Sequence, residues 1–169
     1  MRFFYQGVTK TGLDVAVKIP RDRTDLDLHF KQFENEFDNL TKVNHVNIVQ
    51  FLGYCYEIKQ TPIQFGEQIV FAEKTWPALC FEYLHNGSLQ NHLSDESCAL
   101  DWHTRYKIIK GTCEGLRYIH EDESLVHLHL KPDNILLDKD MVPKISDFGL
   151  SKVFGDELTR TTESPLGTQ

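Results

Sequence analysis

The sequence contains no apolar run that approaches the length of a membrane span. Its first residues, Met-Arg-Phe-Phe-Tyr, hold one basic residue and no apolar stretch long enough for a signal peptide. An excess of basic residues is also absent, since 25 acidic residues against 18 basic ones give a net charge of −7. We therefore expect a cytoplasmic chain without a membrane segment, and the charge argues against a nucleic-acid partner.

Closely spaced cysteines are missing as well. The four cysteines lie far apart, with no C-x-x-C pair, at Cys55, Cys80, Cys98 and Cys113. Four free thiols in a reducing compartment are the economical interpretation. The chain shows no internal repeat and no low-complexity tract, and 169 residues with 40% hydrophobic side chains are enough for one domain with a core.

A motif with chemical meaning begins at Val126 and reads Val-His-Leu-His-Leu-Lys-Pro-Asp-Asn. Ser146-Asp147-Phe148-Gly149 follows it. The pair resembles the catalytic loop and the metal-binding turn of protein kinases, usually H-R-D-L-x-x-x-N and D-F-G. An Asx-rich turn between two short strands is the simpler alternative, but both motifs at this spacing favour the kinase interpretation.

The loop departs from the kinase pattern at two positions. His127, Lys131 and Asn134 fit it, whereas Leu128 stands where Arg is usual and His129 stands where the catalytic Asp belongs. Leu128 removes the Arg that normally ties the loop to a phosphorylated activation segment.

The resemblance implies ATP and Mg²⁺ as cofactors, with a protein as substrate or signalling partner. Mg²⁺ is a hard cation that prefers oxygen ligands, which assigns it to Asn134 and Asp147. Lys131 then offsets charge on the transferred phosphoryl group. His129 occupies the position that orients the substrate hydroxyl.

Near the start of the chain, residues 3–7 and 14–19 read as two strands joined by a Thr11-Gly12 turn. Val15-Ala16-Val17-Lys18 resembles the kinase strand that carries the phosphate-binding Lys, which assigns Ala16 and Lys18 to the ATP site. An exposed strand-end lysine is the alternative. The glycine-rich loop of kinases should come just before, but the sequence starts too late to contain it, so we expect weakened nucleotide affinity.

Residues 26–43 predict an amphipathic helix, since apolar residues recur at three- and four-residue steps: Phe30, Phe33, Phe37, Leu40 and Val43. The segments Phe33-Glu34-Asn35-Glu36 and His45-Val46-Asn47-Ile48-Val49 resemble plant receptor-like kinases. The resemblance pairs Glu36 with Lys18 and makes His45 a structural loop residue. The alternatives are that Glu34 is the residue that pairs with Lys18, or that these acidic residues form an ordinary solvent-exposed face of the helix.

The middle of the chain predicts strands over residues 49–57 and 69–71, with a polar loop over 59–67 between them. Residues 78–84 predict a buried strand that runs into a connector. By resemblance this connector is the hinge, where backbone groups of Glu82 and Leu84 bind adenine and Phe81 gates the back pocket.

The second half predicts a short helix after Gly87-Ser88-Leu89 and a long helix from about Leu100 to His120. We expect one face of the long helix to lie in the core: Trp102, Tyr106, Ile109, Cys113, Leu116 and Ile119. Residues 135–137 and 143–145 predict two short strands, and the resemblance places Leu136 beneath adenine. The residues after Gly149 resemble an activation segment, with candidate phosphorylation sites at Thr159, Thr161, Thr162, Ser164 and Thr168.

These observations predict an α+β, two-lobe, protein-kinase-like fold that is incomplete. Residues 1–84 form the small lobe without its first strand and glycine-rich loop, with the hinge near 82–84. Residues 85–169 form the first part of the helical lobe and end in the activation segment. A full-length relative would be anchored in a membrane by a segment that this sequence does not contain.

His129 sets the expected activity. An imidazole accepts a proton but carries no negative charge, so we expect catalysis to fall by several orders of magnitude, about 10⁴-fold, as when a catalytic carboxylate is removed elsewhere. The interpretations are therefore a weak Ser/Thr protein kinase, a pseudokinase that acts as a binding or scaffold module in signalling, and a truncated chain without function.

Overall fold

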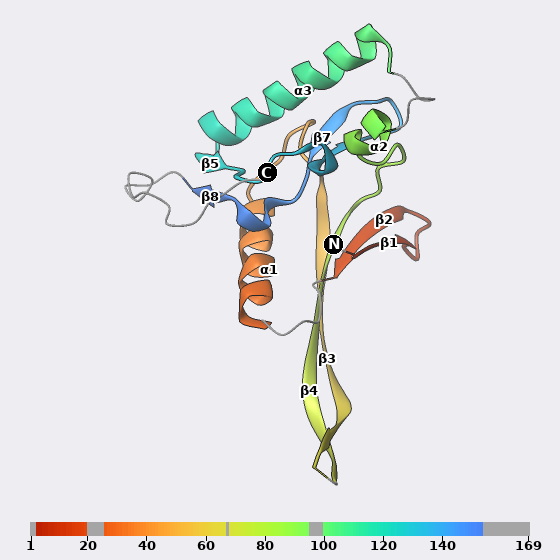
Figure 1. Cartoon of the computed structure of the whole chain (residues 1–169), viewed down its shortest axis with the longest axis vertical. Coiled ribbons are helices and arrows are strands. Elements are labelled where there is room, and N and C mark those ends of the chain that lie inside the picture. The colour runs from red at the N-terminus through yellow and green to blue at the C-terminus, as the bar shows by residue number, and fades with distance from the viewer. Residues whose placement is uncertain (1–2, 20–25, 67, 95–99, 154–169) are drawn as a thin grey trace.

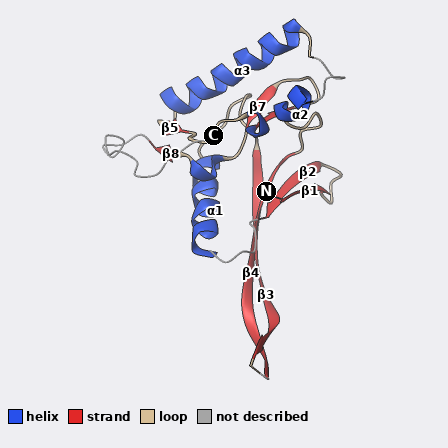
Figure 2. Ribbon diagram, viewed as in Figure 1, coloured by secondary structure: helices blue, strands red, loops and turns tan. Residues whose placement is uncertain are grey.

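An antiparallel sheet in the order β1-β2-β4-β3 forms the first half of the protein. The computed structural model describes residues 3–19, 26–66, 68–94 and 100–153. The first half holds β1 (Phe3–Val8), β2 (Asp14–Ile19), α1 (Leu26–Leu40), β3 (Phe51–Phe65) and β4 (Gln68–Glu82). The long strands lie together, with α2 and α3 at the other end of the molecule (Figures 1 and 2). The α+β class that the sequence predicts is confirmed.

The β1–β2 hairpin agrees with the sequence prediction. Its register pairs Phe3 with Ile19 and Val8 with Asp14. In the turn, the Thr9 N–H donates to the Leu13 carbonyl at 2.9 Å, and Gly12 takes a φ of 83°. Such a left-handed conformation favours glycine, which explains the turn at this place.

The β3–β4 hairpin corrects the prediction of a polar loop over residues 59–67. Both strands are 15 residues long and pair from Phe65↔Gln68 back to Phe51↔Phe81, so residues 59–65 are strand. The predicted strands at 69–71 and 78–84 are parts of β4, which ends at Glu82. The hairpin projects far from the rest of the molecule (Figure 1).

The prediction failed because both faces of the projecting ribbon meet solvent. Ile58, Ile63, Phe65 and Phe71 are exposed together with their polar neighbours. A strand without a buried face needs no alternation of polar and apolar residues, so its sequence resembles a loop.

Helix α1 ends at Leu40, three residues before the predicted end. Leu40 is buried, and Phe33, Phe37 and Val43 pack against the core as expected. The Phe37 ring makes an edge contact with Phe51, with centroids 5.8 Å apart. The side chain of Phe30 lies outside the described residues.

The second half contains α2 (Leu89–Ser94), α3 (Trp102–Glu121) and short strands. The strands are β5 (Leu125–Val126), β6 (Ile135–Leu137), β7 (Pro143–Ile145) and β8 (Lys152–Val153), and the 3₁₀ turns are η2 (Pro132–Asn134) and η3 (Phe148–Leu150). β6 pairs with β7 and β5 with β8, both antiparallel. The strands predicted at 135–137 and 143–145 are confirmed.

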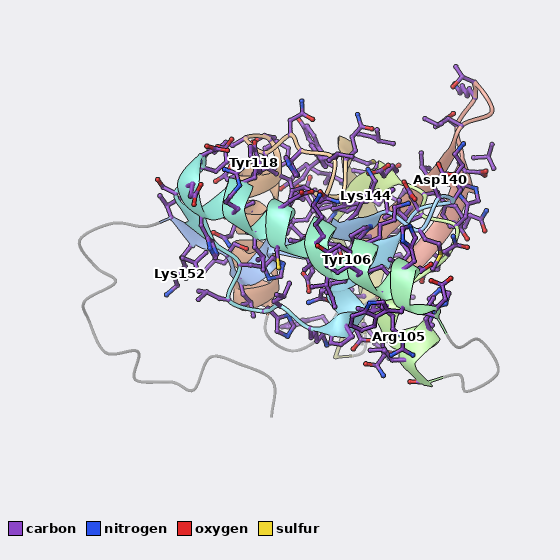
Figure 3. The ribbon with its side chains drawn as sticks, turned by 90° about the horizontal axis from the view of Figure 1, so that it is seen from above. Arg105, Tyr106, Tyr118, Asp140, Lys144 and Lys152 are labelled. Atoms are coloured by element: carbon purple, nitrogen blue, oxygen red, sulfur yellow. The ribbon has the colours of Figure 1, made fainter. Side chains whose placement is uncertain are left out.

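The face that α3 buries differs from the predicted one. Ile119 is buried and Leu116 packs against the core, but Trp102, Tyr106 and Ile109 are 74%, 57% and 55% exposed. Cys113 is exposed too. Figure 3 shows Tyr106 on this helix, with Tyr118 toward its C-terminal end.

Small residues explain why α3 turns another face to the core. Its buried residues are Ile108, Gly111, Gly115 and Ile119. A Cβ at Gly111 would lie 2.7 Å from Cγ of Pro143, and one at Gly115 would lie 2.9 Å from the Asn47 carbonyl oxygen. Close approach of the helix to its neighbours therefore requires glycine, which carries no apolar signal in a sequence pattern.

One core joins the two halves. The Val49 N–H donates to the Ile145 carbonyl at 2.9 Å, and the Ile145 N–H donates to the Asn47 carbonyl at 2.8 Å. The buried cluster draws side chains from both halves: Leu40, Ile48, Val49, Leu79, Phe81, Leu84, Ile119, Leu125, Ile145 and Phe148. Segments remote in sequence are thereby fixed relative to one another.

Within the described ranges, no helix combines the length and the apolar character needed to cross a membrane. Cys55, Cys80 and Cys113 are free thiols, and Cys98 lies outside the described residues. Burial raises the pKa of the Cys80 thiol. The candidate phosphorylation sites between Thr159 and Thr168 also lie outside the described residues.

Candidate active site

A buried lysine joins two carboxylates from distant parts of the chain. Lys18 of β2 donates through Nζ to Oε2 of Glu36 on α1, and to Oδ1 of Asp147 at 3.2 Å. The three residues are 8%, 4% and 6% exposed. A buried ammonium is tolerated when it is paired, and here two carboxylates surround it. Glu34, the alternative partner, is exposed.

Asp147 has an unusual backbone conformation. Its φ of 74° and ψ of 68° lie in the left-handed region, which costs a non-glycine residue roughly 1–2 kcal/mol. Its carboxylate is divided between two neighbours. Oδ1 faces Lys18, and Oδ2 lies 3.5 Å from Nδ1 of His129. The strained conformation thus aims both oxygens into the site.

His127 ties the loop to the turn. Its ring is 2% exposed and packs edge-on against Phe148, with centroids 5.1 Å apart. Nε2 lies 2.9 Å from the Ser146 carbonyl oxygen, and Nδ1 lies 3.3 Å from the His129 backbone nitrogen. A carbonyl only accepts and an amide N–H only donates, so the proton belongs on Nε2. His127 therefore positions both His129 and the Ser146-Asp147 segment.

Asn134 holds the other side of His129. Its Nδ2 donates to the His129 carbonyl at 2.7 Å and lies 3.3 Å from the ring Nδ1. Asn134 is 7% exposed. Its amide nitrogen thus fixes the loop, which leaves the amide oxygen as the atom suited to a cation.

Lys131 lies outside the buried cluster. Its Nζ is 3.4 Å from Oδ2 of Asp133, and its side chain is 30% exposed. Leu128, at the position of the usual Arg, has a φ of 59°. The backbone is therefore left-handed at this position, and its side chain is apolar.

The residues assigned to adenine lie around the connector after β4. β2 and β4 pair Ala16 with Phe81 and Val15 with Glu82. Leu84 and Phe81 are buried, and Ala16 and Leu136 pack against the same core.

The Glu82 side chain has a structural role that the sequence did not indicate. Its Oε1 accepts from Lys144 Nζ and from the Gln50 N–H, each at 2.8 Å. This carboxylate therefore joins the end of β4 to β7.

Two asparagines of α1 were missed by sequence reasoning. Asn35 Nδ2 lies 2.9, 3.1 and 3.4 Å from the carbonyl oxygens of Ser151, Gly149 and Phe148. Asn39 Nδ2 lies 3.4 Å from the Ser151 carbonyl. Asparagine is a poor residue for a helix interior, so two of them four positions apart was the available signal.

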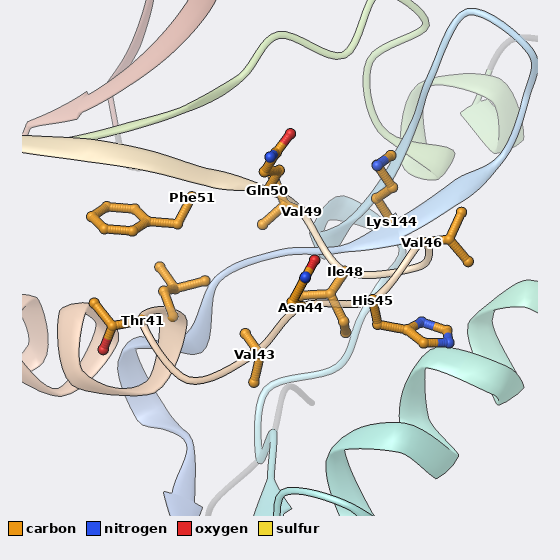
Figure 4. Close-up of a pocket in the computed structure, with 11 residues that line it drawn as sticks. Thr41, Val43, Asn44, His45, Val46, Ile48, Val49, Gln50, Phe51 and Lys144 are labelled. Carbon is orange, nitrogen blue, oxygen red and sulfur yellow. The ribbon is translucent and has the colours of Figure 1, made fainter.

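A separate hollow lies between the end of α1 and β7 (Figure 4). Its lining includes Thr41, His45, Gln50 and Lys144. The His45 ring stacks on Tyr118, with centroids 4.9 Å apart, and its Nδ1 accepts from the Asn47 N–H, as fits a structural loop residue. Lys18, Glu36 and Asp147 do not line this hollow, so we assign it no part in the site.

The buried cluster offers the parts that phosphoryl transfer requires. An ammonium fixed by a carboxylate is suited to bind phosphate oxygens, and the oxygens of Asp147 and Asn134 are suited to a hard divalent cation. The residue beside them is an imidazole instead of a carboxylate. The donor set therefore fits a metal–nucleotide complex.

Comparison with known proteins agrees with this geometry. The family model described as "Protein kinase domain" matches residues 4–169. The chain is 40% identical over 169 residues to Cysteine-rich receptor-like protein kinase 19 of Arabidopsis thaliana, covering 97% of this chain and 23% of that protein. It is 41% identical over 160 residues to Cysteine-rich receptor-like protein kinase 11 of the same organism, covering 92% and 21%.

Another relative is Receptor-like serine/threonine-protein kinase SD1-7 of Arabidopsis thaliana, 38% identical over 173 residues, with 97% of this chain and 18% of that protein covered. The chain thus spans about a fifth of the length of the relatives it matches.

Proposed function

This chain belongs to the protein kinase domain family, and from that premise we propose that it is a receptor-like Ser/Thr-type kinase domain that binds Mg²⁺-ATP and transfers phosphate weakly. The observation that carries the proposal is the buried contact of Lys18 with both Glu36 and Asp147. It joins β2, α1 and the metal-binding turn in one site.

Lys18 would bind the phosphates of the nucleotide. Glu36 already holds the ammonium in place, so the long Lys18 side chain loses less conformational entropy when a nucleotide binds. The Lys18–Asp147 contact at 3.2 Å supports the same role. Phosphate oxygens would replace Asp147 as the partner of Lys18, and a cation would replace Lys18 as the partner of Asp147.

Asn134 and Asp147 would hold Mg²⁺. Both are buried and both present oxygen atoms, the ligand type that this cation prefers. The bound cation supplies neutralisation of phosphate charge. Lys131, which is partly exposed, would offset charge on the phosphoryl group from the solvent side.

Adenine would lie between the sheet and the second half of the chain. Ala16 and Leu136 would supply apolar contacts, and the backbone of Glu82 and Leu84 would supply hydrogen bonds. The buried Phe81 beside Ala16 supports this placement. Residues 1–84 would then act as the small lobe and 85–169 as part of the large lobe, with the hinge near 82–84.

His129 would limit the reaction. The substrate hydroxyl needs an acceptor that orients it and takes its proton, and an imidazole, unlike a carboxylate, brings no negative charge to this task. We place the chain in the cytoplasm, as the kinase part of a membrane-anchored relative would be, with a protein as substrate or partner.

A pseudokinase scaffold is the second candidate. The projecting β3–β4 hairpin favours it, because Phe65, Ile69 and Phe71 are 76%, 72% and 69% exposed there. Exposed apolar side chains on one element are common at protein interaction sites.

Calorimetric titration of the chain with Mg²⁺-ATP tests the proposed function. We expect saturable binding that Lys18→Met weakens at least tenfold. Lys110→Met is the matched control, because Lys110 is exposed and pairs with Glu114 on the same helix at 3.7 Å. Equal binding by both variants would refute the assignment of Lys18.

A further inference from the structure

Asn35 joins helix α1 to the turn that follows Asp147. Its Nδ2 lies 2.9 Å from the Ser151 carbonyl oxygen, 3.1 Å from that of Gly149 and 3.4 Å from that of Phe148. Carbonyl oxygens only accept hydrogen bonds, so the amide nitrogen and not the amide oxygen has to face them. Among short side chains only asparagine carries two N–H donors, and its chemistry therefore matches this group of acceptors.

The turn needs donors at this place. Phe148–Leu150 (η3) is a 3₁₀ turn of three residues, and so short a turn leaves carbonyl groups without partners inside it. Phe148 and Gly149 are buried, where an unpaired carbonyl group costs free energy. Hydrogen bonds from Asn35 therefore stabilise the turn, and with it the backbone of Asp147, the residue directly before it.

The position of Asn35 on α1 couples this contact to the lysine cluster. Asn35 directly precedes Glu36, so the two side chains leave the helix about 100° apart. Glu36 faces Lys18 of β2, and Asn35 faces the turn after Asp147. One turn of α1 therefore holds both carboxylate partners of Lys18 in place, Glu36 directly and Asp147 through η3.

Ser151 extends the connection to the loop that contains His127 and His129. It is fully buried, and its carbonyl accepts from Asn35 and from Asn39, one helical turn further along α1. Its hydroxyl donates to the His127 carbonyl at 3.3 Å. Helix, turn and loop are thus joined through one buried residue.

We propose that Asn35 is a positioning residue for the Lys18–Glu36–Asp147 cluster. It locks α1 to the turn, so that Glu36 and Asp147 meet on Lys18 before a nucleotide arrives. The inference deepens the proposed function and rests on it for the use of the cluster, because preassembled ligands lose little freedom when a nucleotide binds.

Asn35→Asp tests the donors while it keeps the shape of the side chain. In mildly alkaline buffer the ionised carboxylate donates nothing and turns negative charge toward three carbonyl oxygens. The chain without ligand receives a short pulse of an acetylating reagent under native conditions, and mass spectrometry gives the rate at Lys18. We expect acetylation at least about fivefold faster than in the parent, as the loss of a buried hydrogen bond predicts for local opening.

Two controls separate positioning from a general loss of stability. Lys144 is an internal reference, because it pairs with Glu82 at 2.8 Å and its side chain is 13% exposed, against 10% for Lys18. Its acetylation rate should not change. Asn91→Asp makes the same substitution at an exposed position of α2 and should leave both rates as in the parent.

Asn35→Ala removes the donors without adding a charge, and it replaces the Asp variant if the latter does not fold. An unchanged rate at Lys18 would overturn the proposal, because the amide would then contribute nothing to the cluster. Equal acceleration at Lys18 and Lys144 would overturn it too, because Asn35 would then support the whole fold.

Binding of Mg²⁺-ATP links the result to the proposed function. If the parent binds Mg²⁺-ATP, Asn35→Asp should bind it about fivefold more weakly, and equal affinity would also overturn the proposal. If the parent does not bind Mg²⁺-ATP, the proposed function fails. The acetylation rates are measured without ligand, so they still decide whether Asn35 positions the cluster.

Discussion

His129 contacts Asp147 with Nδ1 3.5 Å from Oδ2, so the residue at the place of the catalytic base adjoins the residue assigned to the metal. The other oxygen of Asp147 binds Lys18. One carboxylate therefore links the proposed phosphate-binding side of the site to its proposed hydroxyl-binding side. A change at His129 should therefore affect both proposed sides of the site.

Replacing His129 by Asp should raise phosphoryl transfer, because a carboxylate accepts the substrate proton and carries the missing negative charge. The expected gain is several orders of magnitude, up to about 10⁴-fold. Incorporation of labelled phosphate into the chain and into a generic protein substrate measures it. His103→Asp, at an exposed position of α3, is the control. Efficient transfer by the parent chain, or no gain in the variant, would contradict the role given to His129.

Truncating Asn35 to Ala should loosen the segment that follows Asp147. The Asn35 amide serves the carbonyls of Phe148, Gly149 and Ser151, and losing these bonds should lower the free energy of unfolding by about 1–3 kcal/mol. Urea unfolding measures the loss, and hydrogen exchange at Gly149 should quicken. Glu34→Ala, exposed on the same helix, should leave both unchanged. Equal stability of the two variants would show that the amide contributes little.

Sequence patterns located some parts of this molecule well. The β1–β2 hairpin and the β6–β7 pair lie where residue types predicted them. Motif spacing selected Lys18, Glu36 and Asp147, and the structure brings their side chains together. The assignment of these residues to ATP and Mg²⁺ stays a prediction.

Sequence patterns did not predict other parts of the molecule, and the reasons are physical. The buried face of α3 depends on Gly111 and Gly115, which allow close packing because they lack a side chain. The long β3–β4 hairpin has no buried face along its outer part, so periodicity gave no strand signal. The Asn35 contacts join residues more than a hundred positions apart, and local sequence patterns do not reveal such contacts.

Shortening the β3–β4 hairpin should leave the rest of the fold intact. Residues 58–75 can be replaced by an Asn-Gly turn, because Glu57 and Trp76 are paired in the register. On β4, the residues that pair with β2 are Leu79 to Glu82, which the deletion does not touch, so the core should persist. The unfolding midpoint should stay close to that of the parent, and binding of an apolar dye should fall. A collapse of the cooperative transition would mean that the hairpin supports the core.

Asp101 should make stability depend on pH. Its carboxylate accepts the Thr104 N–H at 2.8 Å at the start of α3, and this hydrogen bond lowers its pKa below the ordinary 3.8. The charged form is therefore favoured in the folded state. Its stabilisation is present at neutral pH and is lost as pH falls through the folded-state pKa.

Urea unfolding of the parent, Asp101→Asn and Asp101→Ala at neutral and acidic pH isolates this contribution. Asn also caps helices, so Asp101→Asn should stay folded and lose part of the pH dependence. Asp101→Ala should be less stable than both at neutral pH. Identical pH dependence in all three proteins would refute the role of the cap.

The most direct test of the account is a thermal melt of the purified chain with and without Mg²⁺ and ATP. A ligand that binds only the folded state raises its stability, by about 2.7 kcal/mol at a hundred times the dissociation constant. We predict a higher midpoint that requires both Mg²⁺ and ATP, that disappears in Asp147→Ala, and that persists in the control Asp140→Ala, whose side chain is exposed. A cooperative melt with the same midpoint in all conditions would contradict the proposed nucleotide site.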